Sequence, residues 1–309
     1  MTSTGDLATA GSYGEAPSGY RLPDATHVGA VTLQVASLER SVQYYTQVLG
    51  MHVAHRAGAT VQLTPHGDDR VLVVLHEQRG ARPVDRRGRL GLYHFALLLP
   101  SRSDLGRFVA HLAAIGARAA SGDHWVSEAL YLTDPDGLGI EVYADRPREA
   151  WRRSGRELLM ATDPVDLHAL VQAAGETRWA GMPAGTVMGH VHLHVGDLAG
   201  AQAFYSEALG LDRMVWRYPG ALFLAAGGYH HHLGTNVWAG PTAAPAPADE
   251  ARLLHWALDL PSRADLEAVQ ASLAAAGYPA ELAVAPDGTA TVTTQDPWGT
   301  RLVVRVAGR

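Results

Sequence analysis

The chain contains no cysteine among its 309 residues. Disulfide bonds, thiolate zinc sites and cysteine nucleophiles are therefore excluded. Any metal site in this protein has to be built from histidine, aspartate, glutamate or tyrosine side chains, which shortens the search for ligands considerably.

Long apolar runs and an excess of positive charge are also missing. No segment approaches the length that a helix needs to span a bilayer, and the first two dozen residues have neither a cationic start nor an apolar centre. The formal net charge is -6 with both signs interspersed, so the chain lacks the basic stripe that nucleic acid or an anionic membrane requires. These absences predict a cytoplasmic protein that acts on a small molecule, with residues 1–25 forming a disordered tail.

Internal repeats organise the rest of the chain. Residues 31–51 align without gaps with residues 191–211. A second pair of repeats begins at Tyr93 and Leu254, where YHFALLLPSRSDL matches LHWALDLPSRADL. The chain therefore consists of four similar modules, which we number one to four in chain order.

Each module has the same predicted order of elements. An apolar strand with period-two alternation comes first, and a turn with Asp, Ser or Pro leads into an amphipathic helix. A glycine ends each helix, at Gly50, Gly116, Gly210 and Gly277. The remainder of each module is β-rich and is divided by turn residues. The sequence thus predicts an α+β fold of four β-α-β-β-β modules, with 47% hydrophobic residues to fill its cores.

The modules predict two domains. Residues 26–145 hold modules one and two, and residues 187–309 hold modules three and four. Residues 146–186 mix charged residues with glycine and proline. We expect this segment to be a linker that packs on the surface, with one helical stretch from Asp166 to Ala174.

The modules resemble the vicinal-oxygen-chelate superfamily, which contains glyoxalases, bleomycin resistance proteins and extradiol dioxygenases. The resemblance is carried by a first strand followed by DLxxAxxFYxxxLG and by a last hairpin with DPDGxxIE. The strings LYHFALLLPSR, GHVHLHV and AGGYHHHLGTNVWAG are similar to the bacterial catechol 2,3-dioxygenase branch. The resemblance implies that paired modules form two cupped mixed sheets, with a metal ion held inside a cup.

In that superfamily, the metal ligands are first-strand histidines and a glutamate from the last strand of a module. Carried over by resemblance, the first-strand positions of the four modules are Ala30, His94, His190 and His255. The last-strand glutamate is matched by Glu141 in module two but by Val303 in module four. A site between modules three and four would lack its carboxylate. The resemblance therefore implies a metal site of His94, Glu141 and His190, with module two paired to three and a degenerate pair of one and four.

Two histidines and one carboxylate on one face of an octahedron leave positions open for substrate and dioxygen, as an iron(II) oxygenase needs. We expect iron(II) as the cofactor, and Mn(II) or Zn(II) would suit the same ligands. The resemblance implies an extradiol-type dioxygenase that cleaves a catechol- or hydroquinone-like ring. Its partners would be a small aromatic diol and dioxygen, and the sequence also allows a homo-oligomer.

Three residues match catalytic positions of the family. His231 matches a pocket histidine and is expected to act as an acid or base. Tyr131 matches a pocket tyrosine, and His124 is a looser match to a second pocket histidine. By resemblance, Tyr131 and His124 are hydrogen-bond donors to charged oxygens.

The other histidines near these motifs are expected to have lesser roles. His230 and His232 flank His231, and they could either contribute to the pocket or lie at a solvated edge that picks up stray zinc or nickel. His192 and His194 share the strand parity of the predicted ligand on their strand, so we expect them to line the pocket at most.

Two other functions stay open. A glyoxalase-like metal isomerase or lyase usually has a second carboxylate in its site, whereas the corresponding position here is near Gly234. A metal-free protein that sequesters an aromatic compound or antibiotic would hold a planar ligand between aromatic side chains. Trp125, Trp238 and Trp256 are the candidates for that role.

Overall fold

The computed structural model describes residues 5–85 and 88–307. Module one consists of β2 (His27–Val35), α1 (Leu38–Gln47), β3 (His52–Ala57), β4 (Thr60–Thr64) and β5 (Val73–Glu77). Module two consists of β6 (Arg89–Leu98), α2 (Arg102–Ala114), β7 (Ala120–Asp123), β8 (Ser127–Thr133) and β9 (Gly139–Asp145). Both modules have the predicted β-α-β-β-β order.

The second half of the chain repeats this order. Module three consists of β12 (Val187–His194), α4 (Leu198–Ala201), which continues as the π-helix η2 (Gln202–Ala208), β13 (Asp212–Val215), β14 (Ala221–Ala225) and β15 (Leu233–Asn236). The short strand β16 (Ala244–Pro245) follows it. Module four consists of β17 (Arg252–Leu260), α5 (Arg263–Ala275), β18 (Glu281–Val284), β19 (Ala290–Gln295) and β20 (Arg301–Val306).

The module helices start and stop at equivalent positions of the repeat. The N-cap side chain of each accepts a hydrogen bond from a backbone N–H of the first turn; these caps are Ser37, Ser101, Asp197 and Ser262. The four glycines predicted to end the helices all have positive φ, a conformation that glycine adopts at little cost. Local sequence therefore sets the length of each helix.

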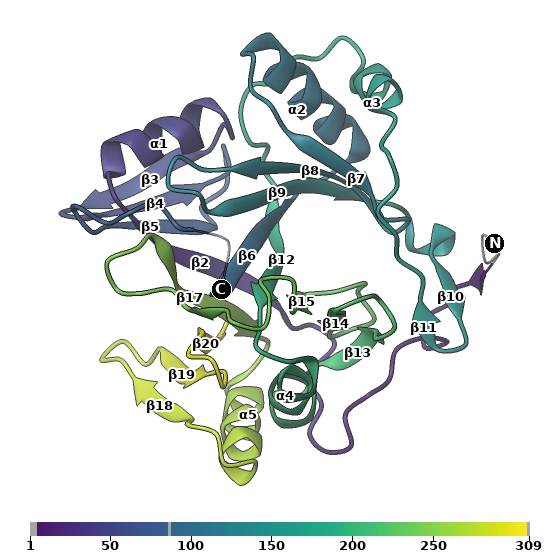
Figure 1. Cartoon of the computed structure of the whole chain (residues 1–309), viewed down its shortest axis with the longest axis vertical. Helices are drawn as coiled ribbons and strands as arrows, with labels where there is room; N and C mark the ends of the chain where they lie inside the picture. Colours follow the sequence, from purple (N-terminus) through teal and green to yellow (C-terminus); the bar gives the residue numbers. More distant parts are fainter. Residues whose placement is uncertain (1–4, 86–87, 308–309) are drawn as a thin grey trace.

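The strands form two large mixed sheets (Figure 1). In the first, β6 of module two runs antiparallel to β12 of module three, and the strand order is β13-β14-β15-β12-β6-β9-β8-β7, with β16 paired to β6. In the second, β17 of module four runs antiparallel to β2 of module one, in the order β18-β19-β20-β17-β2-β5-β4-β3. The two sheets cut across the predicted domains, because each half of the chain gives one module to each sheet.

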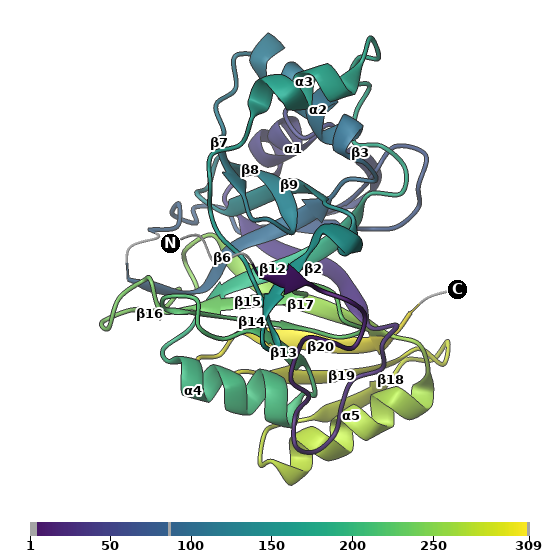
Figure 2. The same cartoon turned by 90° about the vertical axis from the view of Figure 1, so that its right-hand side faces the viewer.

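The sheets occupy the middle of the molecule, with α1, α2 and α3 at one end and α4 and α5 at the other (Figure 2). One cluster of buried apolar side chains runs through all four modules and includes Leu33, Phe95, Leu193 and Trp256. In the part of the chain that the structure describes, no helix has the length and apolar character needed to cross a membrane.

A tyrosine on the helix of one module contacts the aspartate turn of the next module in each half of the chain. The Tyr45 hydroxyl donates to Asp134 at 3.3 Å, and the Tyr205 hydroxyl donates to Asp296 at 2.8 Å. Burial raises the pKa of Asp134 to about 6, although backbone N–H groups of its own turn lower it. These contacts tie modules that are adjacent in sequence but belong to different sheets.

A second contact between the module helix and the aspartate turn of the next module differs between the two halves of the chain. In the first half, Arg40 forms an ion pair with the buried Asp136 of the DPDG turn. In the second half, Trp298 occupies the turn position of Asp136, and a Cβ added to Gly200, at the helix position of Arg40, would lie 3.2 Å from its ring. A charge pair in one half is thus replaced by aromatic packing in the other.

The N-terminal segment differs from the predicted disordered tail. Of residues 1–25, those from residue 5 onward are described, and residues 1–4 lie outside the described part. Tyr13 and Leu22 are buried, and the Leu22 N–H donates to the Gly210 carbonyl of module three at 2.8 Å. Arg21 pairs with Asp212 at 2.6 Å. A few buried apolar side chains, together with ion pairs of Glu15 and Arg21 to module three, therefore fix a segment whose average composition is polar and small.

The segment between modules two and three is structured throughout. It contains η1 (Arg148–Ala150), β10 (Arg152–Ser154), β11 (Glu157–Leu158) and α3 (Leu167–Ala174), and β1 (Asp6–Leu7) joins β10 and β11 in a small sheet. The helix matches the predicted stretch, with Asp166 as its N-cap. Trp151 is fully buried, so this linker does more than cover the surface.

Replacing Gly106 with alanine is expected to lower the free energy of unfolding by about 1–3 kcal/mol. A Cβ at this position of α2 would lie 1.9 Å from the Leu170 carbonyl oxygen of α3, so the two helices would have to separate. Urea unfolding measures the change. Gly19→Ala is the control, because a Cβ there meets nothing within 4 Å and the residue has no positive φ. Equal stability of both variants would contradict the close packing of α2 and α3.

Candidate metal centre

Three adjacent strands bring the predicted ligands together. Ala96 of β6 pairs with His190 of β12 on one side and with Glu141 of β9 on the other. His94 lies two residues before Ala96 and therefore points to the same face of the sheet. The small side chain of Ala96 leaves space between the larger ones, so the imidazole and carboxylate groups can converge above it.

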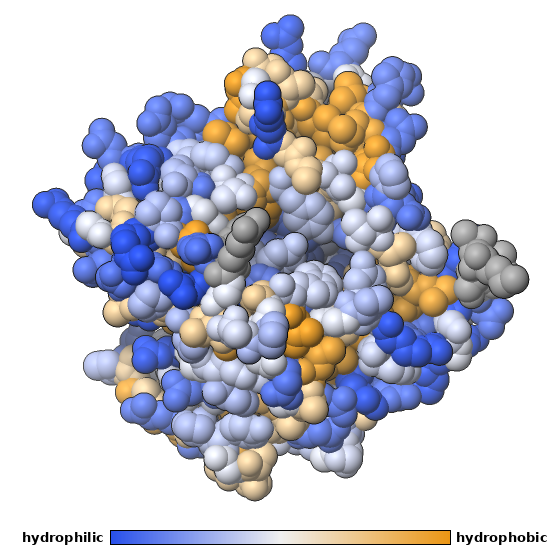
Figure 3. Space-filling view, viewed as in Figure 1, coloured by the Kyte–Doolittle hydropathy of each residue, from blue (hydrophilic) through white to orange (hydrophobic). Residues whose placement is uncertain are grey.

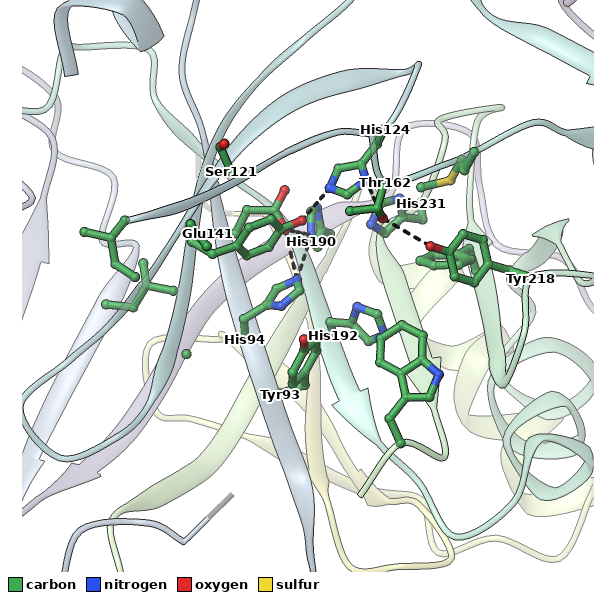
Figure 4. Close-up of a pocket in the computed structure, with 18 of the residues that line it drawn as sticks. Tyr93, His94, Ser121, His124, Glu141, Thr162, His190, His192, Tyr218 and His231 are labelled. Atoms are coloured by element: carbon green, nitrogen blue, oxygen red, sulfur yellow. Dashed lines mark hydrogen bonds and ion pairs between the residues drawn. The ribbon is translucent and has the colours of Figure 1, made fainter. Parts of the chain in front are cut away.

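The ligand atoms of these residues are mutual neighbours. Glu141 Oε2 lies 3.0 Å from His94 Nε2 and 3.1 Å from His190 Nε2, and the two Nε2 atoms are 3.3 Å apart (Figure 4). All three side chains are buried. Donors about 2.1 Å from a metal and at right angles to each other would be about 3.0 Å apart. The spacing therefore fits three ligands on one face of an octahedron.

The charges of the three residues also suit a divalent cation. Burial acts to raise the pKa of Glu141, but the adjacent His190 and His94 outweigh it and hold that pKa well below its usual value. Burial lowers the pKa of His94, with Glu141 acting in the opposite direction. The ionised carboxylate and neutral imidazole are the forms that bind metal.

The second sheet has no comparable group. His255 is half-buried, and its Nε2 lies 3.0 Å from the Thr32 hydroxyl. The equivalent positions on the paired strands hold Ala30 and Val303, which cannot bind a metal. Within residues 5–85 and 88–307, His94, Glu141 and His190 form the one group of three or more donors with metal-binding geometry.

His94, Glu141 and His190, which we call the triad, line a cavity of about 450 Å³. The cavity corresponds to the recess near the centre of the face in Figure 3. Besides the triad, its wall includes Tyr93, Tyr131, His192, Tyr218, Phe223 and Trp238. Met160, Ala161 and Thr162 of the linker close another side, and the Thr162 hydroxyl lies 3.1 Å from that of Tyr218. The wall of this cavity, which we call the chamber, is therefore largely aromatic and contains residues from both halves of the chain.

His124 and Tyr131 meet beside the triad. His124 Nδ1 lies 2.7 Å from the Ala161 carbonyl, which can only accept, so Nδ1 carries the proton. A neutral His124 then accepts a hydrogen bond at Nε2 from the Tyr131 hydroxyl, 2.5 Å away. Burial, followed by the charge of Glu141, raises the pKa of Tyr131 well above 10. Tyr131 is thus a neutral donor held in place by His124.

His231 stands next to the triad. Its ring centroid lies 4.1 Å from that of His190 and 5.0 Å from that of Phe223. Burial, followed by the nearby His190, lowers the pKa of His231 well below 6.5. Of the two alternatives for His230 and His232, the solvated edge is wrong, because both residues are buried. The short connection between β14 and β15 folds inward, and hydrogen bonds within the protein replace the expected contact with water.

His192 lines the cavity, as its strand parity predicts, and His194 lies further along the same face. Asn236 is within hydrogen-bond distance of both, 2.9 Å from His192 Nε2 and 2.6 Å from His194 Nδ1. A Cβ added to Gly234 would lie 2.9 Å from the His192 ring. The position at which glyoxalases were expected to have a second carboxylate is therefore filled by the His192 ring.

Only one of the three tryptophans proposed for an aromatic-binding pocket lies at the cavity. Trp238 is in its wall. Trp256 is fully buried in the main core, and the indole N–H of Trp125 donates to Asp163 outside the cavity. Spacing along the sequence could not distinguish these environments, because each tryptophan lies on or next to a strand.

Several residues of the chamber were absent from the sequence-based prediction. Phe223 lies on β14, Tyr218 lies in the connection between β13 and β14, and Met160 to Thr162 come from the linker. No motif marks them. Asp145 was also missed, although it shares strand parity with Glu141 and could have been found by that signal.

Comparison with known proteins agrees with this architecture. The family model described as the Glyoxalase/Bleomycin resistance protein/Dioxygenase superfamily matches residues 27–142 and 187–304. The chain is 46% identical over 259 residues to a protein named catechol-2,3-dioxygenase from Bacillus subtilis (strain 168), covering 83% of this chain and 90% of that one.

Solved structures support the fold. A structure from Bacillus subtilis subsp. subtilis str. 168 superposes with a TM-score of 0.63 and 13% identity, covering 94% of this chain and 87% of the other. Glyoxalase I from Zea mays gives a TM-score of 0.55 at 18% identity, with 91% and 92% covered. At these identities the structures support the fold alone. From its two family-model matches and its 46% identical relative, this chain belongs to the Glyoxalase/Bleomycin resistance protein/Dioxygenase superfamily.

Proposed function

We propose that this protein is an extradiol-type, ring-cleaving dioxygenase. The observation that carries the proposal is the buried group of His94, Glu141 and His190, which opens on a chamber lined by aromatic side chains. The 46% identity to a catechol-2,3-dioxygenase over most of the chain supports the same reaction class.

The cofactor of the proposed reaction is iron(II), held by His94, Glu141 and His190. When bound, it would supply a Lewis acid for the diol hydroxyls and electrons for dioxygen. If iron(II) were bound, these three residues would hold it and would leave coordination positions for substrate and dioxygen. Mn(II) suits the same donors, whereas Zn(II) would bind but has no redox chemistry.

The residues around the metal site have separate roles in proton transfer and hydrogen bonding. We assign His231 as the acid or base that accepts a proton from the diol and later returns it, because its ring lies directly beside His190. The Tyr131 hydroxyl donates to His124 when no ligand is bound, and a charged substrate oxygen would compete for that proton. His124 is thus assigned to orient Tyr131, which would be the donor to the substrate.

The chamber favours an uncharged aromatic diol. Its described lining contains no arginine or lysine, so it offers no cation to a ring that carries a carboxylate. Tyr93, Phe223 and Trp238 provide flat apolar faces for a ring. A volume of about 450 Å³ lies within the usual range for small-molecule sites.

The other two functions are less well supported. A glyoxalase-like reaction would lack its second carboxylate, since the His192 ring fills the space above Gly234. A metal-free sequestering protein would have no use for three buried donors that converge within about 3 Å of one another.

Iron(II) reconstitution under anaerobic conditions, followed by oxygen uptake with a panel of diols, tests the proposal. We expect about one iron per chain, one dioxygen consumed per diol without added reductant, and a coloured ring-cleaved product. Uncharged catechols should exceed carboxylated ones in kcat/KM by at least about tenfold, because an unpaired buried carboxylate is costly. Failure to retain any stoichiometric metal would instead favour the sequestering protein. Isomerase activity with zinc or nickel, without oxygen uptake, would favour a glyoxalase.

A further inference from the structure

Strand β9 carries a second acidic residue on the face that bears Glu141. Residues 141, 143 and 145 alternate to the same side of the strand, so Glu141, Tyr143 and Asp145 point in one direction. Glu141 belongs to the metal site, whereas Asp145 lies beyond it. Its Oδ1 is 2.9 Å from Nε2 of His230, which has no exposed surface at all.

His230 in turn contacts the proposed acid or base. Its Nδ1 lies 2.7 Å from Nδ1 of His231, and these atoms share one hydrogen bond. The Asp145 carboxylate can only accept, so the proton of the Asp145 contact is on His230 Nε2. When His230 carries only this proton, its Nδ1 has a lone pair, and His231 is the donor in the contact between the two Nδ1 atoms. That leaves His231 Nε2 without a proton.

Two tyrosines keep Asp145 in its accepting role. The Tyr229 hydroxyl donates to Asp145 Oδ1 at 3.2 Å, and the Tyr143 hydroxyl lies 2.6 Å from that of Tyr229. Since Tyr229 gives its proton to Asp145, Tyr143 is the donor to Tyr229. A Cβ added to Gly189 would lie only 1.8 Å from the Tyr143 oxygen, so the glycine before His190 makes room for this network.

We propose that Asp145 and His230 are positioning residues that fix the tautomer of His231, so that its Nε2 faces the chamber as a proton acceptor. The proposal deepens the dioxygenase assignment and rests on it for the identity of the proton donor. A proton leaves the diol hydroxyl for His231 Nε2, while Nδ1–H remains bonded to His230. The arrangement resembles the use of a buried carboxylate to hold a catalytic imidazole in hydrolases, with one additional ring between them.

Nitrogen-15 NMR of histidine-labelled, Zn(II)-loaded full-length protein reads the tautomer without turnover. We expect His231 to be protonated at Nδ1 and bare at Nε2, with its signals identified by their loss in His231→Phe. Asp145→Leu removes the acceptor for His230, and His230→Phe removes the acceptor for His231, so both should shift the proton of His231 towards Nε2. His232→Phe is the matched control. This histidine lies in the same run but accepts from the Ala226 N–H at 3.2 Å, and its substitution should leave the His231 signals unchanged.

Steady-state kinetics of the iron(II) form gives the second measurement. Asp145→Leu and His230→Phe should lower kcat for catechol at least about tenfold, because a His231 protonated at Nε2 cannot accept the diol proton there. The KM for catechol and the iron content should stay near those of the unsubstituted protein. Asp145→Glu keeps a carboxylate and should recover part of kcat.

The two proposals fail in different ways. A protein that cleaves no diol refutes the dioxygenase assignment, and the NMR spectra still report the tautomer. Protonation of His231 at Nε2 in the unsubstituted protein overturns the positioning role, as does an unchanged tautomer in both Asp145→Leu and His230→Phe.

Discussion

Replacing Glu141 with alanine is expected to abolish stoichiometric metal binding and to reduce diol cleavage more than about 1000-fold, because several kcal/mol of charge stabilisation are lost. Glu141 is the only carboxylate in the triad and lies within hydrogen-bond distance of both ligand histidines. Without it, two neutral imidazoles would face a divalent cation with no compensating charge. Metal analysis after anaerobic reconstitution measures the first effect, and oxygen uptake measures the second.

A matched pair of histidine variants separates the two sheets. His94→Ala should lose the metal as Glu141→Ala does, whereas His255→Ala, at the equivalent position of module four, should retain it. His255 is paired with a threonine hydroxyl and has no carboxylate partner at the equivalent of Glu141. Retention of metal by His94→Ala, together with its loss in His255→Ala, would overturn the assignment of the site to modules two and three.

Replacing His231 with phenylalanine is expected to lower kcat by about 100- to 10 000-fold, the usual contribution of a general acid or base. Phenylalanine keeps the ring that packs on His190 and Phe223, so the walls of the chamber should be preserved. Metal content should be unchanged, because His231 is not one of the three converging donors. Iron analysis and steady-state kinetics on the same preparation measure both quantities.

His232→Phe is the control for this substitution, since it changes the adjacent buried histidine without altering the chamber wall. It should retain most of kcat. Loss of iron from His231→Phe would identify His231 as a fourth ligand, and unchanged kcat would remove it from the proton chemistry.

The repeats made the fold and the triad accessible from sequence. A strand register is exact to one residue, since a shift of one turns a side chain to the other face. The resemblance to the vicinal-oxygen-chelate superfamily supplied the ligand positions, and the alignment of modules carried them to His94, His190 and Glu141. Val303 in place of a glutamate then favoured a site between modules two and three. In the structure, the donor atoms of these three residues lie 3.0 to 3.3 Å apart.

What sequence could not supply was the surroundings of the triad. Met160 to Thr162 reach the chamber because the linker packs against module two, and no periodic pattern marks that contact. The burial of His230 and His232 follows from the tertiary path of a short connection. Asp145 had the correct parity, but its role depends on His230, which lies in another module.

The order of the strands along the chain has a consequence for synthesis. The sheet that holds the triad is built from strands between Arg89 and Asn236, apart from the short strand β16 that follows. The other sheet needs both β2, which precedes this interval, and β17, which follows it. A chain leaving the ribosome can therefore form the sheet of modules two and three before module four has been made. At that stage β17, the strand that pairs with β2, has not yet been synthesised. Until His190 emerges, however, only two of the three donors exist. Metal binding at the proposed site must follow the synthesis of β12, and a chain that ended before His190 would lack one of the three donors.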